Sequence, residues 1–558
     1  MTARDDTWFS DDATNPNGGK KKRLRAVQPG ETRDPRPVIR VEKGEIPRMV
    51  DQAIEALAAQ PADVYTREGD LVHVAAAPPP TDDAPSIPEG SPRIYTLSSA
   101  GLTEHLSRVA AWSKSAAPAD PPPPVVGAFL ARRRWTGLRP LSAIVDAPTL
   151  RPDGSLLTEP GYDAPTRTLY APSERWPAPN PEPTPDDALA SLTRLWDVFV
   201  DFPWETDAGA YVAISALLTL VARPAIEGCI PCFVFDANSP ASGKTLVSDV
   251  IATIALGRDA GRHSYPTDPK GSNEEVSKAL AGYALAGARL ICWDNLSPAN
   301  VFGGPALESV STARDKASFR LLGKNENAEL PWRTVMLATG NNVAISRDLE
   351  RRSLIPRFVS KWETADQRPL DSFRHPERAG RLISWARQER RQLVLDALTV
   401  LRAYHVAGRP PQGLRWASFE EWTELVPSAI QWAGGHSPLA CRPADTGRGS
   451  EERDALAIVL RDWPRIDSTG EGVTAASAIA TLYPDTRPGE HRPPDGLDDL
   501  RDALETLAPP RDGRSPDKLK LTGAFRRVRQ VVIGGRSLEA AEQKTRTGVV
   551  RWRVVGAS

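Results

Sequence analysis

The spacing of apolar residues in the middle of the chain predicts an ordered series of helices and strands. One amphipathic helix is indicated by Leu189, Leu192, Leu195, Trp196 and Phe199. A second helix is predicted over 208–221, and the apolar run at 233–235 indicates a buried strand. After a polar loop, apolar residues from Leu246 to Ile254 follow one face of a third helix. Strand, loop and helix therefore occur in the order that a phosphate-binding unit requires.

On the N-terminal side of this region, short helices and short strands alternate. Helices are predicted near 49–59 and 102–112, and a longer mixed segment, 138–170, contains a turn at 152–154. The predicted strands lie at 63–65, 71–75 and 93–97. Together these elements predict a small α+β domain.

On the C-terminal side, a helical region is predicted from about 374 to 432. Beyond it, helices are expected at 475–482 and 497–507, and a third is expected to start at Ser515, which caps a helix well when a proline follows. Two strand-like segments, 531–538 and 549–554, end the pattern. Three helices followed by a hairpin are typical of a winged-helix domain.

Proline runs mark the boundaries between these regions. The chain has 53 prolines, and a dense stretch from Pro177 to Pro185 separates the first α+β region from the next helix. From the order of predicted elements we expect an α/β fold class with a P-loop NTPase-like core and smaller flanking domains. The predicted parts are a basic N-terminal tail without fixed structure (1–42), an α+β domain (43–176), a Pro-rich linker (177–186), the core (187–372), a helical region (373–450) and a winged-helix-like domain (451–558).

Composition adds little about partners. With 70 Lys and Arg against 71 Asp and Glu, the net charge of −1 neither favours nor excludes a nucleic-acid partner. No apolar run approaches the roughly 20 residues that cross a bilayer, and the first residues have no signal core, so we expect a cytoplasmic protein without a membrane partner. Cys229 and Cys232 have the spacing of a redox or zinc pair, but no second pair follows. We expect them to be buried residues at the start of a core strand.

The most specific motif is the loop between the predicted strand and the third helix. It matches GxxxxGK[ST], with Asn in place of the first glycine. Because Asn tolerates a positive φ better than other non-glycine residues, we expect Asn238 to adopt one there. Lys244 would hold the β- and γ-phosphates of ATP, and Thr245 would bind Mg²⁺. The predicted nucleotide-binding residues are Asn238, Ser239, Pro240, Ala241, Ser242, Gly243, Lys244 and Thr245.

Two further strands end in polar residues. The first, starting at Arg289, ends at Asp294 and Asn295, and Asp294 is the candidate that orients Mg²⁺. Asn295 stands where many ATPases carry a glutamate that activates water. Since an amide cannot accept that proton, either Asn295 only positions the water or another carboxylate helps. The second strand, starting at Thr334, ends at Asn341 and Asn342, either of which could sense the γ-phosphate.

Two arginines, Arg351 and Arg352, follow the second of these strands. Guanidinium groups stabilise the charge that builds up on a transferring phosphate, and they often come from a neighbouring subunit. Either residue is therefore a candidate arginine finger.

The order of these motifs resembles the phage and plasmid primase-associated ATPases of superfamily 3 helicase type. The resemblance extends over most of the chain after residue 45. It implies an AAA+ core that assembles into a homo-oligomeric ring, usually a hexamer, and moves along single-stranded or forked DNA using ATP. It also implies a role in replicating a phage, plasmid or integrated element. No primase domain is recognisable upstream, so a primase or polymerase would act in trans.

The C-terminal region is the predicted DNA contact. Residues 511–553 carry twelve Lys and Arg against four Asp and Glu, which suits contacts to phosphates. Arg526, Arg527 and Arg529 fall on the third helix, and Arg551 and Arg553 on the wing. A solvated basic surface is the alternative. Within the core, Lys324 lies where such helicases place a DNA-tracking loop.

Two other functions remain open from sequence. One is a nucleotide-controlled DNA-binding protein that loads or regulates replication without unwinding, which Asn295 and the missing primase suggest. The other is an NTPase of a defence system that uses the same motor.

Overall fold

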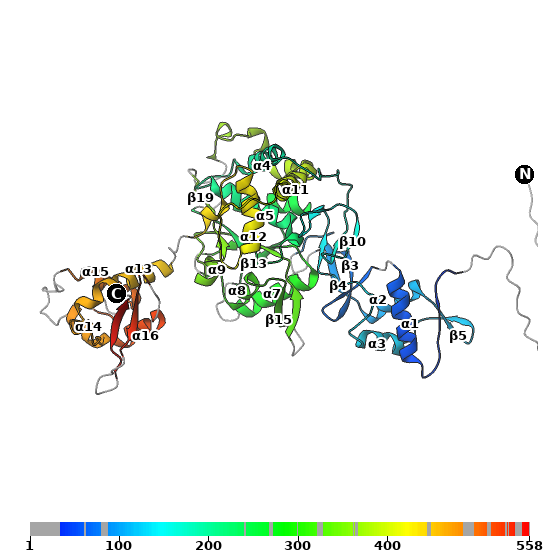
Figure 1. Cartoon of the computed structure of the whole chain (residues 1–558), viewed down its shortest axis with the longest axis horizontal. Coiled ribbons are helices and arrows are strands. Elements are labelled where there is room, and N and C mark those ends of the chain that lie inside the picture. Colours follow the sequence, from blue (N-terminus) through cyan, green and yellow to red (C-terminus); the bar gives the residue numbers. More distant parts are fainter. Residues whose placement is uncertain are drawn as a thin grey trace, which may run out of the picture. The chain divides into compact units, whose positions relative to one another are not determined.

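The structure is a computed structural model, and the chain is coloured from blue to red along the sequence in Figure 1. It divides into two compact units, one of Met1–Ala62 with Ser98–Gly137 and one of Asp63–Leu97 with Leu138–Ser558. The described residues are 34–60, 63–79, 87–238, 242–266, 272–297, 300–320, 327–360, 362, 367–443, 448–483, 496–510, 515–529, 533, 535–541 and 549–556.

The first unit is a three-stranded sheet with three helices. Strand β1 (Val38–Arg40) pairs in parallel with β5 (Ala111–Lys114), which pairs antiparallel with β6 (Ala117–Ala119). Helix α1 (Ile46–Ala59) buries Met49, Val50, Ala53, Ile54 and Leu57, which recur at helical spacing. The other helices are α2 (Ser99–Val109) and α3 (Pro123–Ala131).

The remaining residues of the predicted 43–176 domain belong to the second unit. They form an antiparallel sheet of β2 (Val64–Arg67), β3 (Asp70–Ala76) and β4 (Pro92–Thr96). A second small sheet joins β7 (Ala143–Val145), β10 (Gly161–Asp163) and β11 (Thr168–Tyr170). Asp146 follows β7 and forms ion pairs with Arg258 and Arg289, both outside the 43–176 range. These strands are therefore fastened to the central sheet of the second unit.

The centre of the second unit is a parallel sheet with the strand order β13-β14-β17-β12-β18. All of its pairings are parallel, including that of β19 with β12. The chain is thus a mixed α/β protein with a parallel sheet, as its sequence predicts. The strands are β12 (Cys232–Ala237), β13 (Arg262–Ser264), β14 (Leu290–Leu296), β17 (Val335–Asn341), β18 (Ser353–Leu354) and β19 (Arg357–Phe358).

Both faces of this sheet are covered, which is why its central strand β12 and most of β14 and β17 are buried and largely apolar. Phe233 and Phe235 of β12 pack into a cluster with helices α4 (Pro185–Phe199), α5 (Ala208–Val221) and α6 (Lys244–Leu256). Val234, which points the other way, packs with α7 (Ser272–Ala286) and α8 (Pro305–Ser311). The boundaries predicted for α5 are confirmed. Cys229 and Cys232 are both buried, and Cys232 is the first residue of β12, as expected.

Helices of the region predicted as 373–450 share the same core. Helices α11 (Arg390–Val406) and α12 (Glu420–Trp432) contribute Leu398 and Trp422 to the cluster that holds α4 and α5. Helix α10 (Leu382–Gln388) contacts α6. The remaining short elements of this unit are β8 (Thr149–Leu150), β9 (Leu156–Leu157), α9 (Arg347–Glu350) and the 3₁₀ turns Arg223–Ala225, Leu370–Ser372, Pro376–Arg378 and Pro438–Cys441.

A hairpin of β15 (Lys316–Arg320) and β16 (Asn327–Pro331) projects from the body that contains α7 and α8 (Figure 1). Two buried arginines hold its base. Arg67 of β2 donates to the carbonyl oxygens of Ala284 at 2.7 Å and Pro331 at 3.5 Å. Arg223 donates to that of Trp332 at 3.2 Å. Burial lowers the pKa of Arg67 to about 10 and that of Arg223 to about 9, so both still carry a charge at neutral pH.

The C-terminal residues form a core of their own, coloured orange to red in Figure 1. Trp463 and Phe525 meet edge to face at its centre, with ring centroids 5.1 Å apart. The elements are α13 (Arg448–Asp462), the 3₁₀ turn Trp463–Arg465, α14 (Ala475–Leu482), α15 (Asp498–Leu507), α16 (Lys518–Val528) and the antiparallel strands β20 (Arg536–Ala540) and β21 (Trp552–Gly556).

The N-cap predicted for α16 is wrong by two residues. The cap is Asp517 rather than Ser515, because its carboxylate accepts the backbone N–H groups of Leu519 at 2.9 Å and Lys520 at 3.0 Å. An aspartate at this position satisfies two amides that the helix itself cannot bond.

No helix in the described part of the chain is long and apolar enough to cross a membrane.

Candidate functional site

The site begins at the loop between β12 and α6. Gly243 caps α6 with φ 95°, and a Cβ placed on it would lie 3.3 Å from the ring of Phe202. Only glycine combines that backbone angle with that close approach. The free N–H groups of the first turn of α6, with the positive end of the helix dipole, favour an anion at this position. Ser239, Pro240 and Ala241 lie outside the described residues.

The positive φ predicted for Asn238 is wrong. Asn238 is not among the non-glycine residues with positive φ in the described part of the chain. Its backbone N–H donates to the carbonyl of Phe358 at 3.2 Å, and its side-chain oxygen accepts from the N–H of Ser360 at 3.4 Å. Asn238 thus continues the pairing of β12 with β19, where a left-handed backbone is not needed.

Lys244 is the first residue of α6, and its side chain is 8% exposed. Its ammonium group donates to the side-chain oxygen of Asn341 at 2.6 Å and to the hydroxyl of Ser242 at 2.9 Å. Burial lowers the pKa of Lys244, while the negative charges of Asp236 and Asp294 act in the opposite direction. The cation is therefore held at the carboxyl ends of β12 and β17.

Asp294 lies at the end of β14, on the other side of β17. The hydroxyl of Thr339 donates to its carboxylate at 2.5 Å, and that of Thr245 does so at 3.4 Å. Arg262 of β13 is 3.8 Å from its second oxygen. A carboxylate and a hydroxyl close together are hard oxygen ligands, and Mg²⁺ is commonly bound by one or two carboxylates together with water and substrate phosphates. Thr245 and Asp294 therefore fit a Mg²⁺ ion.

The asparagines at the ends of β14 and β17 make different contacts. Asn341 accepts a hydrogen bond from Lys244 at 2.6 Å, and Asn342 accepts one from Arg357 at 2.8 Å. Asn295 and Asn342 have positive φ, 57° and 47°. The side chain of Asn295 is exposed, and its backbone N–H donates to Thr339 at 3.2 Å.

Sequence reasoning missed several residues of this cluster. Thr339 is two residues before Asn341, so in a strand both face the same side, and that spacing was the available signal. Asp236 of β12 accepts the N–H of Val343 at 3.0 Å, and Arg357 is 4.0 Å from its carboxylate. Burial raises the pKa of Asp236. Asp236 and Arg357 are brought together only by the pairing of β12 with β19.

Arg351 and Arg352 do not contact these residues in the described structure, and they differ from each other. The Arg351 side chain is 62% exposed and pairs with Asp348 at 2.7 Å. Arg352 donates to the carbonyl of Glu308 at 2.9 Å and to the hydroxyl of Ser311 at 3.4 Å. Arg351 is therefore accessible, whereas Arg352 is tied to the end of α8.

The residues expected to contact DNA differ in how exposed their side chains are and in which partners they have within the chain. Arg526 and Arg529, at and beyond the end of α16, are exposed. Arg551 pairs with Glu471 at 3.1 Å, and Nε of Arg553 is buried without a hydrogen-bond partner among the described residues. The side chain of Arg527 and the whole of Lys324 lie outside the described residues. Among the members of the predicted set whose side chains the structure describes, Arg526 and Arg529 are thus the most exposed.

Comparisons with known proteins find only distant similarity. No protein-family model and no curated protein matches the chain. Among solved structures, it is similar to the NrS-1 C-terminal region at 14% identity and a TM-score of 0.32, over 70% of this chain and 80% of that one. It is similar to an active helicase, the SCCmec type IV Cch, at 13% identity and a TM-score of 0.28, over 88% and 92%.

A third similarity is to the JCV helicase, at 13% identity and a TM-score of 0.18, over 49% of this chain and 73% of that one. Because all three TM-scores are below 0.5, these similarities establish neither the fold nor the function of this chain.

Proposed function

We propose that this chain is a P-loop ATPase of AAA+ type that hydrolyses ATP with Mg²⁺ and drives movement on DNA. The observation that carries the proposal is the meeting of Lys244, Thr245, Asp294, Thr339 and Asn341. They lie toward the carboxyl ends of the adjacent parallel strands β14 and β17 and at the N-terminus of α6, whose loop follows β12. In open α/β sheets this end is where ligands bind.

Each residue has a distinct task in this proposal. The amides around Gly243 and the ammonium of Lys244 bind the phosphates, and Asn341, which is hydrogen-bonded to Lys244, senses the terminal phosphate. Thr245 and Asp294 hold Mg²⁺, which neutralises charge on the phosphates when it is bound. Asn295 orients the attacking water, and because an amide cannot accept its proton, another carboxylate must do so.

The role of Thr339 can be tested with Thr339→Val, which keeps the shape and removes the hydroxyl. Asp294 and the N–H of Asn295 then lose a partner, so we expect a loss of about 1–3 kcal/mol in unfolding free energy. We also expect ATP turnover to need more Mg²⁺. Thermal unfolding and a Mg²⁺ titration of turnover measure both effects.

The matched control is Thr253→Val, because the Thr253 hydroxyl is buried in α6 without a hydrogen-bond partner among the described residues. That change should leave both quantities unaltered or raise stability slightly. If the two variants have the same unfolding free energy and the same Mg²⁺ dependence of turnover, Thr339 has no role in the site.

The C-terminal part is proposed to be a winged-helix domain that binds DNA phosphates. The double variant Arg526→Ala and Arg529→Ala is expected to weaken binding to all DNA sequences alike. It should also lower the slope of log affinity against log salt by up to about 0.9 for each phosphate that the variant no longer neutralises. Removing two exposed arginines elsewhere, Arg381 and Arg415, is the control. An unchanged salt slope in the first variant would speak against this surface.

The experiment that tests the motor is a comparison of ATP turnover with and without single-stranded DNA, together with a strand-displacement assay on a fork. We expect DNA to stimulate turnover and strands to separate. Measuring mass in solution in the presence of ATP tests the ring, for which we propose a hexamer. A purified protein that does not hydrolyse ATP under any of these conditions would refute the proposal.

A second function is favoured by the exposed side chain and positive φ of Asn295. In that case the chain binds ATP and DNA and controls replication without unwinding. Stimulation of turnover by DNA with no strand displacement would select it over the motor. Replication of a phage, plasmid or integrated element, with a primase or polymerase supplied in trans, is the setting we propose for either function.

A further inference from the structure

A cavity of about 560 Å³ adjoins the loop that ends at Lys244. Ser242, Gly243 and Leu246 form one part of its wall. The volume is in the range of pockets that enclose small organic ligands. Since Ser242 has only a short hydroxyl and Gly243 has no side chain, the cavity continues directly from the position proposed for the phosphates.

Flat side chains line another part of the wall. Phe202, Trp362 and Phe373 all face the cavity, and the guanidinium of Arg368 lies 3.7 Å from the ring centroid of Phe373 and 5.5 Å from that of Trp362. Leu370 also lines it and is 64% exposed, an unusual exposure for leucine in a concave site. Aromatic rings and planar guanidinium groups are surfaces on which a nucleic acid base stacks.

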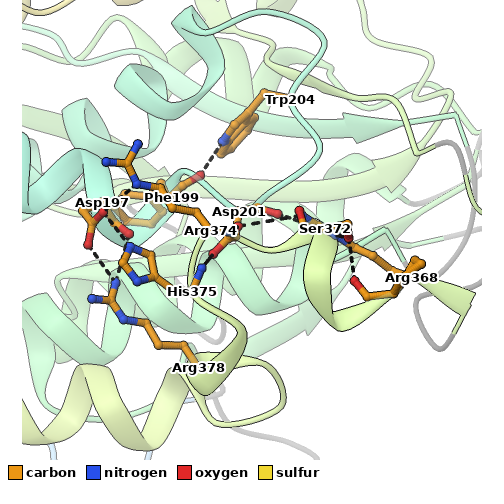
Figure 2. Close-up of polar contacts among 10 residues, drawn as sticks. Asp197, Phe199, Asp201, Trp204, Arg368, Ser372, Arg374, His375 and Arg378 are labelled. Carbon is orange, nitrogen blue, oxygen red and sulfur yellow. Dashed lines mark hydrogen bonds and ion pairs between the residues drawn. The ribbon is translucent and has the colours of Figure 1, made fainter.

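Two carboxylates hold the outer wall in place. Asp201 accepts the backbone N–H groups of Arg374 at 2.6 Å and His375 at 3.0 Å. Asp197, in α4, lies 2.7 Å from Nε2 of His375 and 3.1 Å from the guanidinium of Arg378. Figure 2 shows these bonds joining the end of α4 to the segment that carries His375.

The arginines of this segment are also fixed by packing. Arg368 donates to the backbone carbonyl of Asp201, and Arg378 lies 3.9 Å from the ring centroid of Trp385. The segment 367–380 is thus clamped along its length to the end of α4, which lies far earlier in the chain. Arg368 and Phe373 therefore face the cavity in a defined arrangement.

We propose that this cavity receives the base and ribose of a purine nucleoside triphosphate, and that Asp201 is a positioning residue that sets the stacking wall formed by Arg368 and Phe373. The inference rests on the proposed function, because the triphosphate must bind at Lys244. Purines are favoured because their two fused rings cover more of such a wall than a pyrimidine does. Ser242 and Gly243 join the two halves of the site.

The test compares ATP with inorganic tripolyphosphate, which has the phosphates and no nucleoside. Equilibrium dialysis with labelled ATP gives the affinity for ATP, and competition gives that for tripolyphosphate, both with Mg²⁺. The wild-type chain is expected to bind ATP at least tenfold more tightly than tripolyphosphate, and ATP and GTP more tightly than CTP and UTP.

Two variants probe the wall. Asp201→Asn and Phe373→Leu are each expected to weaken ATP binding at least tenfold and to leave tripolyphosphate binding unchanged. The matched control is Glu377→Gln, which removes a carboxylate charge from the same segment at a residue that does not itself line the cavity, and which keeps an oxygen that can accept a hydrogen bond from His375. It should bind both ligands as the wild type does.

The possible outcomes distinguish a failure of the proposed nucleoside cavity from a failure of the proposed ATPase function. If the wild type binds ATP and tripolyphosphate equally, or if both variants lose both ligands together, the cavity is not the nucleoside site although the phosphate site stands. If both variants bind ATP as tightly as the wild type does, the inference is likewise overturned. If the wild type binds neither ligand, the proposal that this chain is an ATPase is refuted.

Discussion

Alanine in place of Lys244 is expected to reduce ATP turnover at least 10²- to 10³-fold, close to the limit of detection. The ammonium is the cation nearest the proposed terminal phosphate, and loss of one preorganised donor to developing charge has an effect of about this size. The same change also removes the hydrogen bond to Asn341, so that the residue proposed to sense the phosphate is left without its partner.

Stability should change little in this variant. Because burial lowers the pKa of Lys244, the charged side chain is held less favourably in the folded chain than in water, and its removal relieves that penalty. The penalty is present in full at every pH below the folded pKa. We therefore expect Lys244→Ala to unfold within a few degrees of the wild type, measured by thermal denaturation. Lys278→Ala, on the exposed face of α7, is the control for turnover.

Arg351→Ala is expected to lower turnover by about 10³- to 10⁵-fold while nucleotide binding is kept, as for an arginine finger that acts on a neighbouring subunit. Its side chain is largely exposed and is held only by the exposed pair with Asp348, so it can reach out of its own subunit. Mixing Arg351→Ala with Lys244→Ala subunits should restore part of the activity, because each contributes what the other lacks.

Arg352→Ala separates a structural effect from a catalytic one. It removes two hydrogen bonds to the end of α8, so we expect a loss of about 1–3 kcal/mol in unfolding free energy, in contrast to Arg351→Ala. Normal turnover in Arg351→Ala, or the absence of any rescue on mixing, would argue against a shared site.

The sequence predicted the strand, loop and helix of the central motif because they are adjacent in the chain. Periodicity located α5, and the GKT motif located Lys244 and Thr245. Strand order lies beyond such reasoning. Strand β17 lies between β12 and β14, and this order brings Asn341 to Lys244 and Thr339 to Asp294. The order depends on the crossover connections, which local sequence patterns do not encode.

Three other features could not be predicted from the sequence for a related reason. Asp197, Asp201 and the arginines from 368 to 378 resemble solvated surface charges, and only the folded chain brings them together around a cavity. The cap of α16 was misplaced because Ser515 and Asp517 are both good capping residues, and the geometry of the turn selects between them. The separate roles of Arg351 and Arg352 likewise depend on the position of α8.

The base of the β15–β16 hairpin is joined to neighbouring segments by buried hydrogen bonds. Arg67 and Arg223 donate to the carbonyl oxygens of Pro331 and Trp332, and pulling those oxygens away would cost each buried cation one hydrogen bond, while Arg67 keeps its bond to Ala284 and Arg223 its bond to Ile226. Lys316 adds an exposed pair with Glu68 at 2.8 Å. A displacement of this hairpin is therefore expected to move the β2–β3 turn as well.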